Sequence, residues 1–363
     1  MKNNNFLHFI FKNFSCVDYY ENLLLNGTLN CVLVVTDLNL LNHSSKINKF
    51  RKNIFVPYPL GKSILYLAES NNIIAKIILK FYIKLFKNSL LEKKIKKVIK
   101  EYNPNGIFID QRFIPETKSN KRLNLLLNKL NLKKFSIPHA PHYRNANSMV
   151  STKIHNVTYI SNTKDVIREN NVPIEYIGYP NFGNKSLGIK YSKNSKKIIL
   201  LFRYFDREDD DLCDYSNDIE FILVNIPKGF ELVINPHPSL DKLKLKNILR
   251  NSKIENYNIA DEIPSDEYLL CISTFTTAIL NLVSYEIPLM ILNTSSFQFM
   301  RKWQFVDGIY SKLNGFCENN EIFLDSIRNL DFFIANYDTK HNLKILENNF
   351  PKDASNNFLT LIE

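Results

Sequence analysis

Short apolar runs, rich in β-branched and aromatic residues, recur along the chain and are separated by segments with helical spacing. Most of these runs are continuously apolar and do not alternate, which is typical of parallel strands covered on both faces. Strands that alternate with helices predict an α/β, doubly wound architecture. The expected strands are 32–36, 54–56, 106–110, 134–137, 157–161, 175–178, 197–202, 230–235, 268–273 and 288–292.

The pattern breaks once, near the middle of the chain. Residues 179–183 form a turn-like stretch, 191–197 are polar, and a new strand pattern starts directly afterwards. We interpret this break as a linker between two Rossmann-like domains, residues 1–185 and 195–363. The tail from about residue 322 has a helical pattern and is expected to close the second domain, with the last helix able to cross back to the first.

The composition excludes two kinds of phosphate loop. The chain has only nine glycines in 363 residues, and neither the dinucleotide-binding GxGxxG motif nor the GxxxxGK[ST] loop occurs. A phosphate would therefore have to be bound by side-chain hydroxyls or by His and Arg. The five cysteines form no CxxC pair, which argues against a structural zinc site and predicts a reducing compartment.

The net charge is +11, from 47 basic and 36 acidic residues, and it favours an anionic partner unless the many lysines reflect coding bias alone. Lys76, Lys80, Lys84 and Lys87 follow one helical face, and the basic pattern continues to Lys100. This segment is either a helix that lies on an anionic membrane surface or a core helix with a solvated lysine face. Nucleic acid is the least favoured partner.

The ends of the chain show no targeting signal. No signal peptide and no membrane-spanning run is found in the sequence, since neither an apolar leader with a cleavage site nor 18 apolar residues in a row occur. We therefore expect a cytoplasmic protein, able to associate peripherally with the inner face of the membrane.

In the second half, a buried-strand pattern ends at a histidine. His237 stands between Pro236 and Pro238, which would present its imidazole rigidly at the edge of a sheet where ligands bind in α/β proteins. Such a histidine can bind a phosphate, and Arg203, near the end of another expected strand, is a second phosphate candidate. The alternative for His237 is a purely structural cap.

Another strand pattern in this half ends in a group of hydroxyl residues. Ser273, Thr274, Thr276 and Thr277 precede an apolar helical pattern. One such hydroxyl caps a helix, but four suggest an anion site beside free backbone N–H groups. We therefore predict that the second domain binds a phosphate through these hydroxyls.

In the first half, three residues are candidates for a general base. Asp110 ends one expected strand, and His139 and His142 follow another. A histidine near its ordinary pKa, or the carboxylate, can deprotonate a substrate hydroxyl, and Asp110 could instead orient a histidine. The two histidines have no evident third ligand, so a metal site is not expected. The remaining histidines have no supporting context and are interpreted as structural: His8, His43, His155 and His341.

Together these residues resemble bacterial glycosyltransferases of the two-domain GT-B type. The Gly-Tyr-Pro at 178–180 is similar to the entry of their interdomain linker, and His237-Pro238 with Ser273-Thr274 is similar to the HP and S/T motifs of bacterial sialyltransferases and capsule or lipopolysaccharide transferases. The resemblance implies two Rossmann-like domains facing a cleft. It implies an inverting, metal-independent transfer of a sugar to a glycan or lipid-linked acceptor, and we expect a CMP-activated acidic sugar such as sialic acid slightly ahead of other nucleotide donors. His237, Ser273 and Thr274 would then contact the nucleotide phosphate, and no cofactor is needed beyond the nucleotide-sugar donor.

Two departures from that pattern leave alternatives open. Where UDP-sugar transferases carry a ribose-binding Glu, this chain has Asn281, and the acidic pair followed by Gly that supplies the base in sialyltransferases is absent. The base therefore stays open between His139, His142 and Asp110. A CDP-activated polyol-phosphate transferase, a sugar-nucleotide 2-epimerase of the same fold, and a non-enzymatic basic protein that binds membrane surfaces remain as alternatives.

Overall fold

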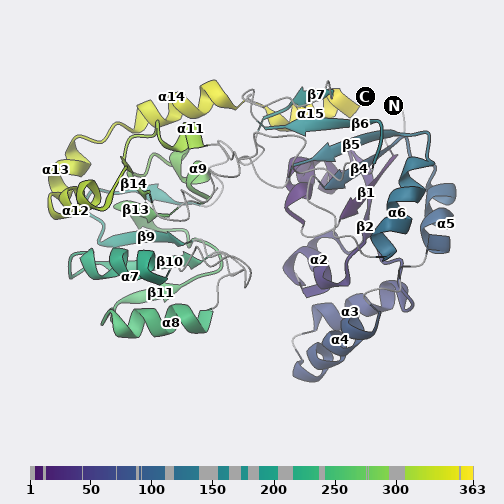
Figure 1. Ribbon diagram of the computed structural model, residues 1–363, viewed down its shortest axis with the longest axis horizontal. Helices are drawn as coiled ribbons and strands as arrows, with labels where there is room; N and C mark the ends of the chain where they lie inside the picture. Colours follow the sequence, from purple (N-terminus) through teal and green to yellow (C-terminus); the bar gives the residue numbers. More distant parts are fainter. Residues whose placement is uncertain are drawn as a thin grey trace. The chain divides into compact units, whose positions relative to one another are not determined.

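The structure is a computed structural model in which the chain divides into two compact units. The first unit comprises Met1–Pro180 with Phe350–Glu363, and the second comprises Asn181–Asn349 (Figure 1). The described residues are 5–10, 14–42, 44–70, 72–86, 90, 92–110, 118–138, 154–162, 173–178, 188–202, 216–236, 242–274, 276, 278–293, 307–350 and 353–362.

The first unit is built on a seven-stranded sheet with the order β3-β2-β1-β4-β5-β6-β7, in which every neighbouring pair is parallel. The chain runs outward from β1 to β3 and then returns to place β4 on the other side of β1. The topological switch point therefore lies between β1 and β4. The strands are β1 (Asn5–Ile10), β2 (Asn30–Val35), β3 (Ile54–Phe55), β4 (Gly106–Asp110), β5 (Lys133–Ile137), β6 (Val157–Ser161) and β7 (Ile174–Tyr176).

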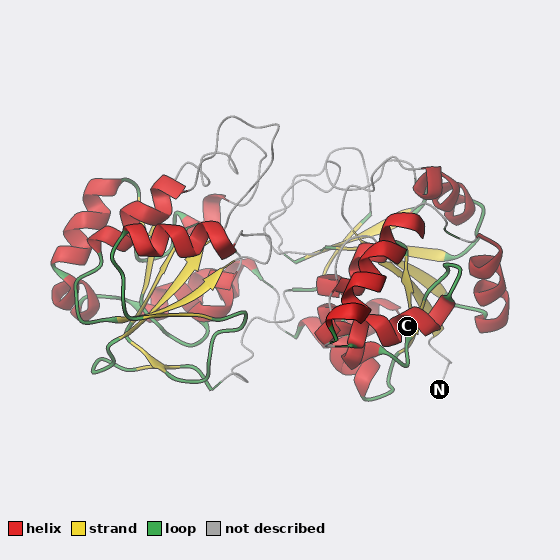
Figure 2. Cartoon of the chain, turned by 90° about the horizontal axis from the view of Figure 1, so that it is seen from below, coloured by secondary structure: helices red, strands yellow, loops and turns green. Residues whose placement is uncertain are grey.

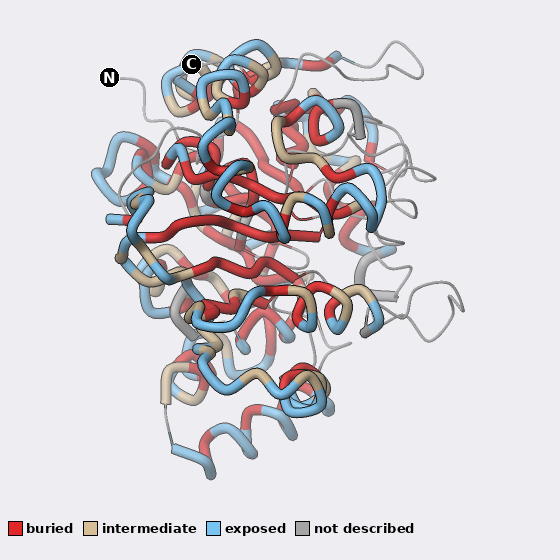
Figure 3. The backbone as a smooth tube through the Cα atoms, turned by 90° about the vertical axis from the view of Figure 1, so that its left-hand side faces the viewer, coloured by how far each residue is buried: buried red, intermediate tan, exposed pale blue. Residues whose placement is uncertain are grey.

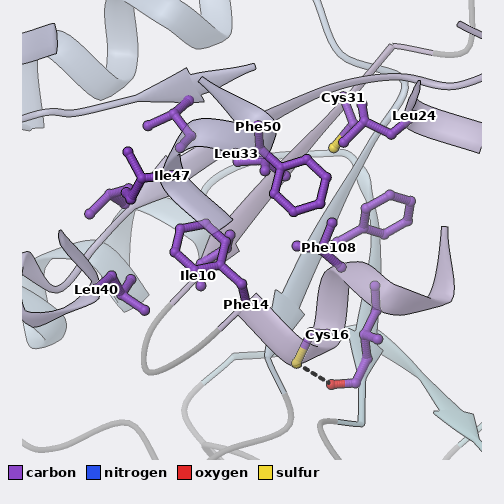
Figure 4. Close-up of a cluster of buried hydrophobic side chains, with 14 of the residues drawn as sticks. Ile10, Phe14, Cys16, Leu24, Cys31, Leu33, Leu40, Ile47, Phe50 and Phe108 are labelled. Atoms are coloured by element: carbon purple, nitrogen blue, oxygen red, sulfur yellow. Dashed lines mark hydrogen bonds between the residues drawn. The ribbon is translucent and has the colours of Figure 1, made fainter. Parts of the chain in front are cut away.

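Helices cover both faces of this sheet (Figure 2). They are η1 (Phe14–Tyr19), α1 (Glu21–Leu25), η2 (Leu38–Asn42), α2 (Ser44–Phe50), η3 (Gly61–Ser63), α3 (Ile64–Glu69), α4 (Ile73–Phe86), α5 (Glu92–Tyr102), α6 (Lys118–Asn128) and α15 (Ala354–Ile362). One face of the sheet, with Ile10 and Phe108, packs against residues of η1, α1 and α2 (Figure 4). The opposite face packs against Ile95 of α5 and Leu123 of α6. Because both faces are buried, the strands are continuously apolar, as the sequence predicts.

The second unit repeats this plan with six strands in the order β11-β10-β9-β13-β14-β15, again parallel throughout. Its switch point lies between β9 and β13. The strands are β9 (Lys197–Phe202), β10 (Glu231–Pro236), β11 (Tyr257–Ile259), β13 (Leu270–Ser273), β14 (Leu289–Leu292) and β15 (Phe316–Cys317), while β8 (Lys190–Tyr191) and β12 (Glu267–Tyr268) form a separate two-stranded sheet. The helices are α7 (Ser216–Asn225), α8 (Lys242–Asn251), α9 (Ala278–Val283), α11 (Asp307–Tyr310), α12 (Asn320–Arg328), α13 (Leu330–Ala335) and α14 (Thr339–Asn349).

The predicted α/β, doubly wound architecture is confirmed, and the predicted strands are present with bounds shifted by one or two residues. The structure adds the short strands β8, β11, β12 and β15, and also β1, an interior strand that the sequence pattern did not suggest because His8 interrupts its short apolar run. In Figure 3 the strands of both sheets are buried, whereas the helices expose their outer sides. Within the described residues, no helix is both long and apolar enough to span a membrane.

The last helix belongs to the first unit. The Phe358 ring of α15 lies 5.5 Å from the ring of Tyr20 and 5.3 Å from that of Phe108. The Asn357 side chain donates a hydrogen bond to the carbonyl of Ile177 (3.1 Å). The C-terminal segment thus completes the core of the unit that the N-terminus begins.

Candidate functional site

The hydroxyl residues of the second unit lie at its switch point. Ser273 ends β13, and its hydroxyl lies 3.2 Å from the Leu201 carbonyl of β9 and 2.6 Å from the Thr274 carbonyl. The Thr274 N–H also donates to Leu201 (3.2 Å). Both side chains are buried, at 1 % exposure. A hydroxyl has one proton to donate, so Ser273 holds the turn in shape by donating to a backbone carbonyl.

Thr276 is the hydroxyl best placed to serve a ligand as a donor. Its Oγ1 accepts a hydrogen bond from the Ala278 N–H (3.4 Å) at the start of α9. This contact uses a lone pair of the oxygen and leaves the hydroxyl proton available. Thr276 therefore caps the helix and can still donate to an anion.

The strand beside this point, β10, is fixed at its carboxyl end by Asn235. The Asn235 amide donates to the carbonyls of Ala260 (2.9 Å) and Asp261 (3.0 Å), which follow the neighbouring strand β11. Pro236, the last residue of β10, is in register with Phe202, the last residue of β9. Three predicted site residues come directly after these strand ends but lie outside the described residues: His237, Pro238 and Arg203.

Two buried asparagine oxygens in the second unit have no hydrogen-bond partner among the described residues. Asn293 directly follows β14, and its Oδ1 is unpaired although its amide donates to the Glu318 carbonyl (2.9 Å). Asn281 lies on α9, and its Oδ1 is also unpaired. A buried acceptor without a partner is costly and often marks the position of a ligand donor. The sequence analysis singled out no role for Asn293; its place one residue after a buried strand is the signal that could have found it.

In the first unit, the switch point between β1 and β4 holds a histidine and an aspartate. Asp110 ends β4 and is 2 % exposed, and its Oδ1 lies 3.0 Å from Nε2 of the fully buried His8. The other ring nitrogen, Nδ1, is hydrogen-bonded to the Tyr20 hydroxyl. A carboxylate only accepts hydrogen bonds, so His8 Nε2–H donates to Asp110 and His8 Nδ1 accepts from Tyr20.

This hydrogen-bonded chain is enclosed by aromatic side chains and a thiol. His8 meets the Phe108 ring edge-on, with centroids 6.0 Å apart, and Cys31 Sγ lies 3.9 Å from the Tyr20 hydroxyl. Burial raises the pKa of Tyr20 well above its ordinary value and that of Cys31 to about 12. Both groups therefore stay protonated at neutral pH, so the Tyr20 hydroxyl remains a donor.

From the sequence, His8 is expected to be structural, and Asp110 is a candidate beside other histidines, His139 and His142. His8 was overlooked because its strand was not predicted, although the run from Phe6 to Ile10 is apolar on both sides of it. The predicted base candidates His139 and His142 lie outside the described residues, two and five positions beyond Ile137, the end of β5. Since β5 neighbours β4 in register, the chain enters that segment next to the Asp110 strand.

No group of three or more His, Cys, Asp or Glu side chains among the described residues is arranged to hold a metal ion.

Comparisons with known proteins identify the fold. No family model matches the sequence, and no curated protein matches it. Among solved structures, a UDP-N-acetylglucosamine 2-epimerase from Listeria monocytogenes is 12 % identical, with a TM-score of 0.54 over 99 % of this chain and 95 % of that chain. The chain has a GT-B fold.

Two transferases with this GT-B fold match over similar lengths. The wall teichoic acid polymerase TagF, soaked with CDPG, is 14 % identical with a TM-score of 0.51, over 99 % of this chain and 88 % of that chain. CalG4, the calicheamicin glycosyltransferase, is 11 % identical with a TM-score of 0.51, over 99 % and 98 %. Identities this low establish the fold alone, so the reaction has to be argued from the residues.

Proposed function

We propose that the chain is a glycosyltransferase that moves a sugar from a nucleotide donor to a hydroxyl of a surface or lipid-linked glycan. The observation that carries this proposal is the chemistry at the two switch points, where ligands of open α/β sheets bind. The second unit has the Thr276 hydroxyl there, and the first unit has a buried histidine–aspartate pair.

In this proposal the second unit binds the donor. The Thr276 hydroxyl donates to a phosphate oxygen, while Ser273 and Thr274 shape the turn and line the same site. His237, presented by Pro238, and Arg203 supply positive charge to the phosphate. Fixed donors of this kind stabilise the negative charge that develops on the departing phosphate.

The first unit would supply the base, with His139, His142 and Asp110 as the candidates. The base takes the proton of the acceptor hydroxyl, whose oxygen forms a bond to the anomeric carbon. At the same time the bond from that carbon to the phosphate oxygen breaks, and the nucleotide leaves with the electron pair. Attack from the side opposite the phosphate inverts the configuration. The contact with His8 favours Asp110 as the group that orients a histidine base, since its Oδ1 is already engaged.

The donor is proposed to be activated by a pyrimidine nucleotide. The names of the similar structures include UDP-N-acetylglucosamine and CDPG. The CMP-activated acidic sugar expected from the sequence motifs has no support from them. It is therefore retained as one arm of the test and not as the favoured donor.

Calorimetric titration with CMP, CDP, UDP and GDP tests the donor site. We expect one pyrimidine nucleotide to bind at least about tenfold more tightly than GDP, because base-specific hydrogen bonds of about 1.5 kcal/mol would be lost with a purine. Equal or absent binding of all four nucleotides would contradict the proposal.

The role of His237 is tested with the donor that corresponds to the preferred nucleotide. His237→Ala should lower turnover by about 10²–10³-fold, the usual effect of removing one donor to the developing anion. His341→Ala is the matched control, since His341 is exposed on the same unit and, in the described part, its imidazole is hydrogen-bonded only to the Lys312 carbonyl (3.1 Å). Normal transfer by the His237 variant, with unchanged circular dichroism, would show that the mechanism is wrong.

Two related reactions are distinguished by their products. A 2-epimerase, favoured by the likeness to the Listeria protein, would convert UDP-N-acetylglucosamine in the absence of any acceptor. A polyol-phosphate transferase, favoured by the likeness to TagF, would release CMP from a CDP-linked donor. A glycosyltransferase instead releases the whole nucleotide of a sugar donor and depends on an acceptor.

A further inference from the structure

The net charge of the chain is concentrated in one segment. Residues 44–102 contain 14 lysines and arginines and three acidic residues. This segment alone therefore carries +11, which equals the charge of the whole chain, and the remaining residues are neutral in sum. The segment runs from α2 to α5, and α2, α3 and α4 lie together at the lower end of the first unit in Figure 1. Residues 44–86, which include α2, α3 and α4, carry +7 of this charge, from eight basic residues and Glu69. A positive field of this size attracts an anionic partner to this end of the unit.

The outer side of α4, in the middle of this segment, is apolar. Six of its large apolar side chains are between 48 % and 73 % exposed: Ile73, Ile74, Ile77, Ile78, Phe81 and Leu85. Single exposed apolar residues are ordinary, but a continuous stripe of them marks an interaction surface. A core helix would expose mainly its lysines to solvent. The outer side of α4 instead exposes apolar side chains as well, so the core-helix interpretation does not account for it.

The inner side of α4 attaches the helix firmly to the unit. Ala75, Leu79, Tyr82 and Ile83 are buried, and the Tyr82 hydroxyl accepts a hydrogen bond from the Leu60 N–H (3.4 Å). The helix is therefore presented as a rigid element of the fold, with the apolar stripe directed outward.

The lysines of α4 follow one flank of the apolar stripe. At 100° per residue, Lys76 and Lys80 fall between the buried side and the apolar stripe, and Lys84 falls just inside the edge of the stripe. Within the described part of the chain none of the three forms an ion pair, and α4 contains no acidic residue. Their charges are thus available to an anionic partner that also accepts apolar side chains.

We propose that α4 is a docking surface for an anionic membrane. The apolar stripe would enter the boundary between headgroups and acyl chains, and the three lysines would extend to the lipid phosphates beside it. A nucleic acid offers phosphates but no place for six apolar side chains. A second copy of this chain would bring +11 against +11, and the same lysines against each other.

Vesicle flotation of the full-length protein, without substrates, tests the proposal independently of any enzymatic activity. Two vesicle compositions are compared: phosphatidylcholine alone, and phosphatidylcholine with about one third phosphatidylglycerol. We expect binding to the anionic vesicles, weakened by salt, and little binding to the neutral ones.

Two triple variants separate the two parts of the surface. Ile74→Gln, Ile77→Gln and Phe81→Gln together should weaken binding at least about a hundredfold through lost apolar burial. Lys76→Gln, Lys80→Gln and Lys84→Gln together should weaken it about a hundredfold on anionic vesicles. All six positions are exposed, so circular dichroism and thermal unfolding should not change.

Matched controls remove the same side-chain types elsewhere. Lys246→Gln, Arg250→Gln and Lys253→Gln remove three exposed charges from the second unit, and Leu125→Gln, Val224→Gln and Phe332→Gln remove three scattered exposed apolar side chains. Both controls should bind vesicles as the wild type does. The proposal is overturned if the apolar variant binds normally, if the controls lose binding equally, or if the wild type ignores vesicles and self-associates through α4 in sedimentation.

Discussion

The two units have the same fold, but their switch points are held together by different groups: a histidine–carboxylate pair in the first unit and neutral hydrogen bonds in the second. In the first unit a buried imidazole and carboxylate, His8 and Asp110, join β1 to β4. In the second unit neutral groups, the Ser273 hydroxyl and the Thr274 N–H, join β13 to the Leu201 carbonyl of β9. The fold determines where polar groups gather, because the connections that follow the two neighbouring strands run in opposite directions at the switch point. The side chains determine whether the position is held by charge or by neutral hydrogen bonds.

This difference has consequences for stability and for function. A buried charge that loses its partner is left in an apolar environment at high cost, whereas a buried hydroxyl that is removed costs little. The first switch point is therefore costly to disrupt. At the second, the Ser273 proton is used by a backbone carbonyl, whereas Thr276 keeps a hydroxyl proton that a ligand could accept.

The largest expected effect concerns His8. His8→Leu should lower the free energy of unfolding of the first unit by about 3–5 kcal/mol, because it leaves Asp110 without its imidazole donor. Ser273→Ala should lower that of the second unit by about 1 kcal/mol. Hydrogen exchange in β1 and in β13 measures the two units separately.

The double variant His8→Leu with Asp110→Leu is the control for this comparison. Since it removes both partners, it should be more stable than His8→Leu alone. If His8→Leu costs no more than Ser273→Ala, the contrast between the two switch points does not hold.

A smaller effect concerns nucleotide binding, which we expect to depend on the second unit and not on the first. Thr276→Val should weaken binding of the preferred nucleotide by about tenfold, the cost of one hydrogen bond to a charged group. Thr276→Ser, which keeps the hydroxyl, should bind normally. Asp110→Asn should leave nucleotide affinity unchanged and reduce turnover. Calorimetry combined with rate measurements checks all three, and weaker nucleotide binding by the Asp110 variant would assign the donor site to the wrong unit.

The smallest effect concerns an ion pair at the opposite end of the second sheet. Lys197, at the start of β9, is hydrogen-bonded to Asp266 and lies 3.7 Å from Glu231. The hydrogen bond from Lys197 is the main cause that lowers the pKa of Asp266. Its stabilisation is therefore present above the ordinary carboxyl pKa and is lost as the pH falls through the lowered one.

Thermal unfolding of Asp266→Asn checks this ion pair. The variant should melt slightly below the wild type at neutral pH, and the difference should vanish in acid and shrink in high salt because the pair is near solvent. The effect of His8→Leu, by contrast, should persist in high salt since the pair is buried. Equal salt dependence of the two would mean that the first-unit pair is solvated.

Much of the architecture can be derived from local pattern. Runs such as Lys197–Phe202 are apolar without alternation, which requires cover on both faces and hence parallel pairing. The group of Ser and Thr residues at 273–277 can also be recognised in the sequence, since it directly follows such an apolar run. The N-terminal strand was missed because one polar residue, His8, interrupts a run of only six residues.

The sequence by itself determined most of the strands of both sheets, the positions of candidate side chains at strand ends and the basic segment around α4. These are local properties, set by the spacing of apolar residues over a few turns. Only the tertiary structure decided that His8 meets Asp110 across 102 positions, that Phe358 returns to the core of the first unit, and that α4 exposes its apolar stripe. Each depends on which elements become neighbours, and the order of strands in a sheet leaves no trace in local periodicity.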